Sequence, residues 1–451
     1  MTDSALATPA ADADPLCGLA ARLAAAPAGL VHGRVTKAVG TMIEASGLIA
    51  GIGEICEIAG AAPQPLAAEV IGFVRGSTLL APMGPVDGLV AQADVVSTGR
   101  GARFPVGAAL LGRVLDPDGR PLDGLGPLPG CRPAPIQRDP PPPLARRPIA
   151  KALPTGVRSL DAFLTLGQGQ RIGIFAPPGA GKSTLLGMIA RHSEADVVVV
   201  GLVGERGREV EEFLHHAIGT AHRARSVLVV ATSDRPPMER IRCAWAATTI
   251  AEHFRDQGRH VLLLMDSLTR FARAQREIGL ACGEPPTRRS YPPSVFAMLP
   301  RLLERAGQGA SGSITAVYTV LTEGEDDNDP IAEELRSLLD GHVMLTRKLA
   351  GAGQHPAVDV LGSISRAMPR VADDRHQRAA TRLRALMAQW QEIEMLVQIG
   401  EYKPGVDPQA DAAVRLRRPL QAFLRQPADE AVPWPAAMQQ LQALAAAFAP
   451  E

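Results

Sequence analysis

The sequence predicts an α/β core with a mainly parallel sheet, a small β-barrel before it and a helical domain after it. In the core, near-continuous apolar runs alternate with helix-like segments such as 207–218 and 238–257; the runs lie at 171–176, 196–203, 226–232, 260–265 and 313–321. Strands that are apolar along their whole length are typical of a parallel sheet covered on both faces by helices. A ligand is then expected at the carboxyl ends of the strands.

The segments before the core have different textures. Residues 1–27 are rich in alanine and lack the basic start and unbroken apolar centre of a secretory signal, so we expect a flexible segment that the mature protein keeps. From 28 to 101, short Val-, Ile- and Leu-rich runs alternate with glycine and proline, which indicates a β-barrel domain. Residues 102–150 include the run Pro140–Pro143, which favours a stiff, extended connector.

The core is expected to span residues 151–370 and a helical domain residues 371–451. In the latter, apolar side chains recur at helical spacing, at Leu383, Leu386, Met387, Trp390 and Ile393. Kinks or interruptions are expected near the prolines of this domain, Pro404, Pro408 and Pro419.

Composition excludes several classes of protein. Lys and Arg (47) balance Asp and Glu (47), so no global field favours DNA, RNA or an anionic membrane. The five cysteines show no Cys-x-x-Cys spacing, which argues against a disulfide framework and a zinc site and fits the reducing cytoplasm. No apolar stretch reaches the ~18 residues that a membrane span needs.

Residues 176–184 read APPGAGKST and follow directly on an apolar run, which is the strand-loop-helix arrangement of a triphosphate-binding loop. Glycines let the backbone turn its amides toward phosphate oxygens. The amides are expected to come from Gly179, Ala180, Gly181, Lys182, Ser183 and Thr184. Lys182 is expected to reach the outer phosphates and Ser183 to bind Mg²⁺. Ala176 replaces the usual first glycine. A chance Gly-Lys-Ser turn would lack the flanking strand and helix.

Two acidic residues end apolar runs of the core. Asp266 closes the run from 261 and is expected to hold the water shell of Mg²⁺, although a helix cap before residue 267 would read the same way. Glu205 is placed to orient the water that attacks the γ-phosphate. Arg206 could stabilise that phosphate; alternatively, Arg206, Arg208 and Glu209 form a solvated helix start.

Together, the motifs at 204–209 (GERGRE), 266–277 (DSLTRFARAQRE) and 283–296 (GEPPTRRSYPPSVF) resemble the export ATPases of type III secretion and flagellar assembly. That family has a RecA-like P-loop core, is similar to the catalytic subunit of rotary ATP synthases, and is matched over roughly residues 28–425. The resemblance implies ATP bound with Mg²⁺ in a homohexameric ring. The segment 231–240 and the pair 288–289 resemble the injectisome-type, virulence branch, with the flagellar branch as the alternative.

Position by position, the resemblance assigns phosphate binding to Lys182, water activation to Glu205 and metal support to Asp266. It also implies that Arg366, in 359–366 (DVLGSISR), is an arginine finger for the neighbouring subunit's nucleotide; a local ion pair is the alternative. Family members usually carry a tyrosine that stacks on adenine where this chain has His355, which leaves discrimination between ATP and GTP open. The acidic loop 323–329 receives no catalytic role.

The resemblance thus implies an ATPase that powers type III protein secretion from the cytoplasmic face of the inner membrane, releasing exported proteins from chaperones and unfolding them. The expected partners are further copies of the chain, stator and stalk proteins, effector-chaperone complexes and the inner-membrane export apparatus. An RNA-translocating ring is disfavoured by the neutral charge and the 4% aromatic content. A rotor-coupled subunit of an ion-translocating ATPase and a scaffold without turnover are two more functions that the motifs leave open.

Overall fold

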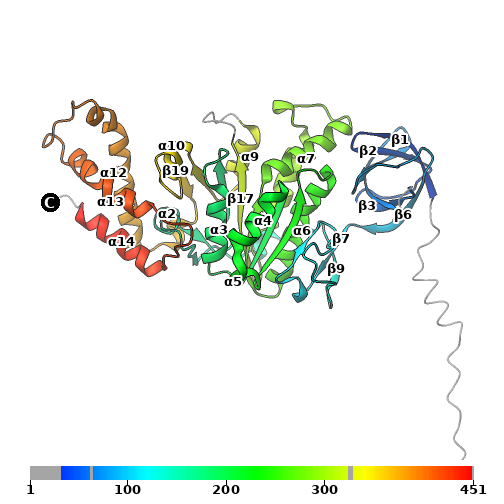
Figure 1. The fold of residues 1–451 in the computed structure, drawn as a ribbon, viewed down its shortest axis with the longest axis horizontal. Coiled ribbons are helices and arrows are strands. Elements are labelled where there is room, and N and C mark those ends of the chain that lie inside the picture. The colour runs from blue at the N-terminus through cyan, green and yellow to red at the C-terminus, as the bar shows by residue number, and fades with distance from the viewer. Residues whose placement is uncertain (1–31, 61–63, 323–328, 449–451) are drawn as a thin grey trace, which may run out of the picture. The chain divides into compact units, whose positions relative to one another are not determined.

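The computed structural model describes residues 32–60, 64–322 and 329–448 and consists of two compact units, Met1–Gly101 and Ala102–Glu451 (Figure 1). The segment 1–27, expected to be flexible, lies outside the described residues, as does all but the last residue of the acidic loop 323–329. Within the described part, no helix is long and apolar enough to cross a membrane.

The first unit is a closed, six-stranded antiparallel barrel, as the alternating apolar runs predict. The strands pair in the order β1-β2-β5-β4-β3-β6. Their bounds are β1 His32–Val39, β2 Met42–Ser46, β3 Glu54–Ile58, β4 Leu66–Val74, β5 Ser77–Pro82 and β6 Asp94–Gly101. The inward-facing side chains, among them Val35, Ile43, Ile58, Val70 and Leu80, form a core of their own.

The second unit is built on a nine-stranded sheet, and its central strands are the five apolar runs of the sequence. The order is β19-β18-β12-β17-β15-β13-β14-β8, with β16 paired to β17. The bounds are β8 Val114–Leu115, β12 Arg171–Ala176, β13 Val197–Glu205, β14 Ser226–Thr232, β15 His260–Asp266, β16 Gly307–Gln308, β17 Ser313–Leu321, β18 Gly341–Leu345 and β19 Val358–Ser365. All pairings along this path are parallel except β18 with β19, and β16 is also antiparallel to β17.

Residues 102–150, expected as a connector, contribute secondary structure to the second unit. β7 (Arg103–Val106) pairs with β9 (Arg132–Pro135), and β8 extends the main sheet beside β14. The short 3-10 turns Ala108–Leu110 and Pro143–Ala145 also lie here. A two-residue strand carries no periodicity that a sequence pattern could reveal, so β8 was not expected. From 136 to 150 the structure contains the turn Pro143–Ala145 and no strand.

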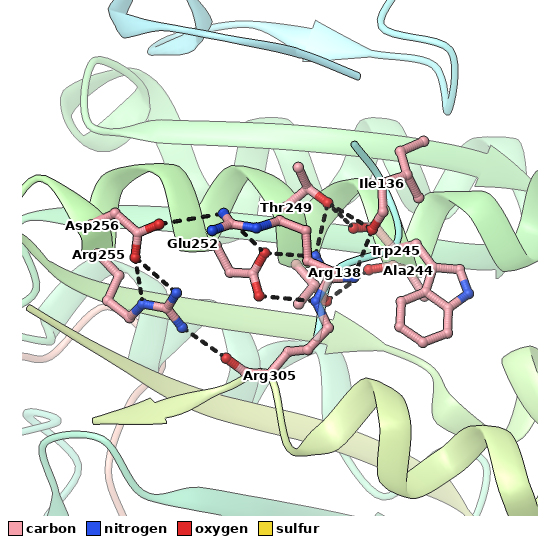
Figure 2. Close-up of polar contacts among 10 residues, drawn as sticks. Ile136, Arg138, Ala244, Trp245, Thr249, Glu252, Arg255, Asp256 and Arg305 are labelled. Carbon is pink, nitrogen blue, oxygen red and sulfur yellow. Dashed lines mark hydrogen bonds and ion pairs between the residues drawn. The ribbon is translucent and has the colours of Figure 1, made fainter. Parts of the chain in front are cut away.

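A buried polar network connects Ile136, just after β9, to helix α6 (Pro237–Asp256) (Figure 2). Arg305 is fully buried and makes a two-pronged ion pair with Glu252, with bonds of 2.9 and 2.6 Å. The same guanidinium donates to the Ile136 carbonyl (2.7 Å) and the Thr249 hydroxyl (3.0 Å) and lies over the ring of Trp245. One buried cation thereby joins three segments that are distant in sequence.

Most helices of the described core lie in the connections between parallel strands. They are α2 Arg158–Phe163, α3 Lys182–His192, α4 Gly207–Glu212, α5 Gly219–Arg223, α6, α7 Leu268–Ala281, α8 Pro293–Leu303, α9 Pro330–Leu338, α10 Arg347–Gly351 and α11 Met368–Val371. The segment expected as one helix over 207–218 is α4 followed by a π-helical stretch, Phe213–Ile218. The short pair β10 (Ala152–Leu153) and β11 (Leu166–Gly167) flanks α2.

Three helices close the chain and pack on one another: α12 Asp374–Gln398, α13 Pro408–Leu424 and α14 Trp434–Ala447 (Figure 1). The expected interruptions at Pro404 and Pro408 are confirmed, because Pro404 lies in the loop and Pro408 begins α13. At Pro419 the helix is not interrupted, because α13 continues through it.

Candidate active site

The phosphate-binding loop connects β12 to α3 at the carboxyl edge of the sheet. Gly179 and Gly181 have φ angles of +83° and +86°, a left-handed conformation that residues with a Cβ rarely adopt. A Cβ at either position would meet no atom within 4 Å, so these glycines are required by backbone conformation and not by lack of space. The first helical bond runs from the Leu185 amide to the Gly181 carbonyl.

The amides of residues 182–184 therefore have no partner inside α3, and no side chain caps this end of the helix. Ser183 and Thr184 are exposed here, whereas Ala180 is buried. A helix start with free amides and no acidic residue in its first turn is a binding site for an anion.

Three charged residues converge beside this helix start. The Lys182 ammonium lies against Asp266 Oδ1 and 3.5 Å from Glu205 Oε1. Both acids end strands, Glu205 on β13 and Asp266 on β15, and these neighbouring parallel strands finish at the same edge. Glu205 and Asp266 are 4% and 3% exposed as whole residues. The structure thus brings together the lysine and both acids singled out in the sequence.

Both carboxylates are buried, and burial strongly shifts the pKa of Glu205. Burial raises the pKa of Glu205 from its ordinary 4.5 to about 7, and the nearby charge of Asp266 adds to the effect. Glu205 also hydrogen-bonds Glu209, whose pKa that contact lowers. For Lys182, burial lowers the pKa, but the carboxylates of Asp266 and Glu205 outweigh burial and the net change is upward. Lys182 stays charged while Glu205 titrates near neutrality.

Two further residues hold these carboxylates in place and were not singled out in the sequence. Arg270, on α7, donates to both oxygens of Glu205 at 3.2 and 3.4 Å. Thr319, on β17, donates to Asp266 Oδ1 at 2.6 Å. A Cβ at Gly204 would lie 3.1 Å from Arg270 Cδ, so the glycine makes room for this arginine. Arg270 lies in the quoted motif 266–277, but nothing in that motif points to its contact with Glu205.

Arg206 and His355 lie on the periphery of the described site. The side chain of Arg206 is 64% exposed and pairs with Glu209 across 3.9 Å, which matches the solvated helix start. His355 is exposed in the loop between α10 and β19, and its carbonyl accepts from the Gln426 amide at 2.8 Å. The same region reaches the phosphate-binding loop through Arg347, whose Nε donates to the Pro178 carbonyl at 3.3 Å. The roles of Arg206 and His355 stay predictions.

Arg366 follows β19 and lies at the end of the sheet where the parallel strands begin, opposite the carboxyl ends that carry the phosphate-binding loop. β18 runs parallel to β12, whereas β19 runs antiparallel to β18 and pairs Ser365 with Gly341. Arg366 therefore emerges level with the start of β12, about 17 Å from the end where the phosphate loop begins, at a rise of about 3.3 Å per residue. Its side chain is exposed and makes no ion pair or side-chain hydrogen bond among the described residues.

The fold and this site define a class: a P-loop nucleotide-binding protein with a RecA-like core. Family models match all three parts of the chain. Residues 35–99 match the beta-barrel domain and residues 156–365 the nucleotide-binding domain of the ATP synthase alpha/beta family. Residues 372–443 match the T3SS EscN ATPase C-terminal domain.

Relatives of known identity agree with these models. A type 3 secretion system ATPase of Xanthomonas euvesicatoria is 54% identical over 409 residues, covering 90% of this chain and 92% of the relative. The flagellum-specific ATP synthase of Bacillus subtilis is 49% identical and covers 88% of this chain and 92% of the relative. The chain belongs to the type 3 secretion system ATPase family.

Solved structures show the same similarity. The assembled ATPase EscN from enteropathogenic E. coli superimposes with a TM-score of 0.88 at 45% identity, over 92% of this chain and all of that one. EscN in complex with its central stalk EscO gives a TM-score of 0.85, again at 45% identity and with the same coverage.

Proposed function

We propose that this chain hydrolyses ATP for type III protein secretion at sites shared between neighbouring copies in a hexameric ring. The observation that carries the proposal is the position of Arg366, exposed at the opposite edge of the sheet from its own phosphate-binding loop. An arginine that far away cannot act on the phosphates of its own chain, so a second copy must supply it. A finger supplied in this way is worth about 10³–10⁵ in rate.

Each buried residue has a distinct part in this proposal. Lys182 and the amides of residues 179–184 hold the phosphates, and Glu205, in its ionised form, orients the attacking water. Arg270 fixes the direction of the Glu205 carboxylate. Catalysis then consists of positioning and charge neutralisation, with no covalent intermediate.

Ser183 and Asp266 are suited to hold Mg²⁺. The Ser183 hydroxyl is exposed at the helix start, and within the described residues Asp266 uses only Oδ1 for hydrogen bonds, so that Oδ2 can accept from the water shell of a metal. Both groups supply the hard oxygen atoms that Mg²⁺ prefers. When bound, the metal would neutralise charge on the phosphate oxygens.

Mixed rings test the shared site. Lys182→Ala removes the phosphate cradle and leaves the finger, whereas Arg366→Ala does the reverse, and each variant alone should be inactive. In randomly mixed rings, about one site in four pairs an intact cradle with an intact finger, so activity should return to roughly a quarter of wild type. Mass measurement must show that mixed rings form. An inactive mixture would then refute the shared site.

The wider setting follows the family. EscN binds the central stalk EscO, and we propose a stalk protein, a stator and effector-chaperone complexes as partners of this chain, at the export apparatus on the cytoplasmic face of the inner membrane. Hydrolysis would release exported proteins from chaperones and unfold them. We also propose that the barrel, the connector, the ATPase core and the helical end, with the boundaries expected from the sequence, are the functional parts of the chain. ATPase rate measured with and without a purified effector-chaperone pair tests the coupling.

A further inference from the structure

The backbone amide of Arg366 is held by Asp340, which directly precedes β18. The Arg366 amide donates to the Asp340 carbonyl at 3.0 Å. The same carbonyl accepts from Gln170 Nε2 at 2.9 Å. Gln170 is fully buried, so this carbonyl is a fixed point and not a solvated turn.

The side chain of Asp340 is in turn fastened to the first residue of β12. Its Oδ2 accepts from the Arg171 amide at 3.0 Å and from Arg171 Nε at 3.2 Å, and its Oδ1 accepts from Arg171 Nη2 at 3.3 Å. A two-pronged arginine-carboxylate pair fixes orientation as well as distance. The Arg171 side chain is only 15% exposed, so the pair is partly shielded from water.

The residue before Arg366 is held as tightly. The Ser365 hydroxyl donates to the Thr165 carbonyl at 2.7 Å and accepts from Gln170 Nε2 at 3.1 Å. Ser365 is 7% exposed and Thr165 is fully buried. The backbone is therefore fixed as far as Ser365, whereas the side chain of Arg366 itself is exposed.

We propose that Asp340 is the positioning residue for Arg366. It fixes the point from which the finger extends and ties it to β12, the strand that ends in the chain's own phosphate-binding loop. This inference rests on the proposed shared site. Because a misplacement of about 1 Å can cost about 100-fold in rate, loosening this anchor should lower turnover without removing the finger.

Turnover of Asp340→Ala and Asp340→Asn rings tests the proposal. We expect kcat to fall about 10- to 100-fold for the alanine variant and several-fold for the asparagine variant, with KM for ATP within about twofold of wild type. Glu304→Gln is the matched control, because it removes the other carboxylate that contacts Arg171 and leaves Asp340 in place. Its turnover should match wild type. Wild-type turnover of both Asp340 variants in verified rings would overturn the inference.

Mixed rings separate positioning from a structural role. Asp340→Ala keeps its own cradle, and Lys182→Ala supplies a correctly placed finger, so mixing the two should restore turnover at the sites they share. A lack of recovery, in rings where Arg366→Ala with Lys182→Ala does recover, would show that Asp340 serves its own chain only. Failure of both mixtures would instead refute the shared site. If Asp340→Ala forms no rings, Asp340→Asn is mixed in the same way.

Discussion

The pH dependence of turnover tests the chemistry of Glu205. Burial and the charge of Asp266 raise its pKa to about 7, and only the ionised form can orient a water for attack. About one tenth of the carboxyl is ionised at pH 6 and about nine tenths at pH 8, so kcat/KM should rise about 10-fold across this range. With its ordinary pKa of 4.5, the group would be ionised throughout and the profile would be flat.

The assay is steady-state phosphate release at subsaturating ATP, with ring mass verified at each pH. Glu205→Gln is the control, because this variant lacks the carboxyl. The pH dependence of its residual turnover therefore reports only the titration of the nucleotide. Arg270→Gln should move the midpoint to higher pH, because the Arg270 charge favours ionised Glu205. A wild-type profile that stays flat after correction by the control would refute the assignment of Glu205 as the water-orienting base.

Three further outcomes are expected. The pKa of Glu205 is higher in the folded protein than its ordinary value, so its contribution to stability is complete below pH 4.5 and is lost as the pH rises through 7. At pH 8 the buried carboxylate is ionised and destabilises the folded state. Glu205→Gln should therefore raise the free energy of unfolding at pH 8 by about 2–3 kcal/mol, measured by urea denaturation. Glu252→Ala leaves the buried Arg305 charge unpaired and should cost about 3–5 kcal/mol, whereas Asp256→Asn, 44% exposed, should cost less than about 1 kcal/mol by the same measurement. His355→Tyr should lower KM for ATP about 2- to 10-fold relative to GTP, and an unchanged ratio would contradict the expectation that tyrosine stacks on adenine better than His355 does.

The sequence predicted the fold where physical rules act locally. Strands buried on both faces must be apolar along their length, so the five central strands could be located from the apolar runs alone. The position of the phosphate-binding loop could also be predicted from the sequence, because the turn before the helix start requires glycines in a left-handed conformation, at Gly179 and Gly181. At Pro419 the sequence left a kink or an interruption open, and α13 continues through this proline.

What the sequence could not provide were contacts between segments that are distant in the chain. Arg270 and Glu205 are on different elements, and Thr319 reaches Asp266 from an adjacent strand, so no spacing rule links them. The anchoring of Arg366 on Asp340 has the same origin. Such contacts exist only because the strand order places β17 beside β15 and β18 beside both β12 and β19.

The direction of one strand decides whether a single copy could work alone. Had β19 run parallel to β18, residue 366 would emerge at the carboxyl edge, beside the phosphate loop of the same chain. Because β19 is antiparallel, the arginine emerges at the opposite edge, a full strand length away. Turnover per chain should therefore rise steeply with protein concentration as copies assemble, and a dilute, verified monomer that hydrolyses ATP at the full rate would contradict the argument from strand direction.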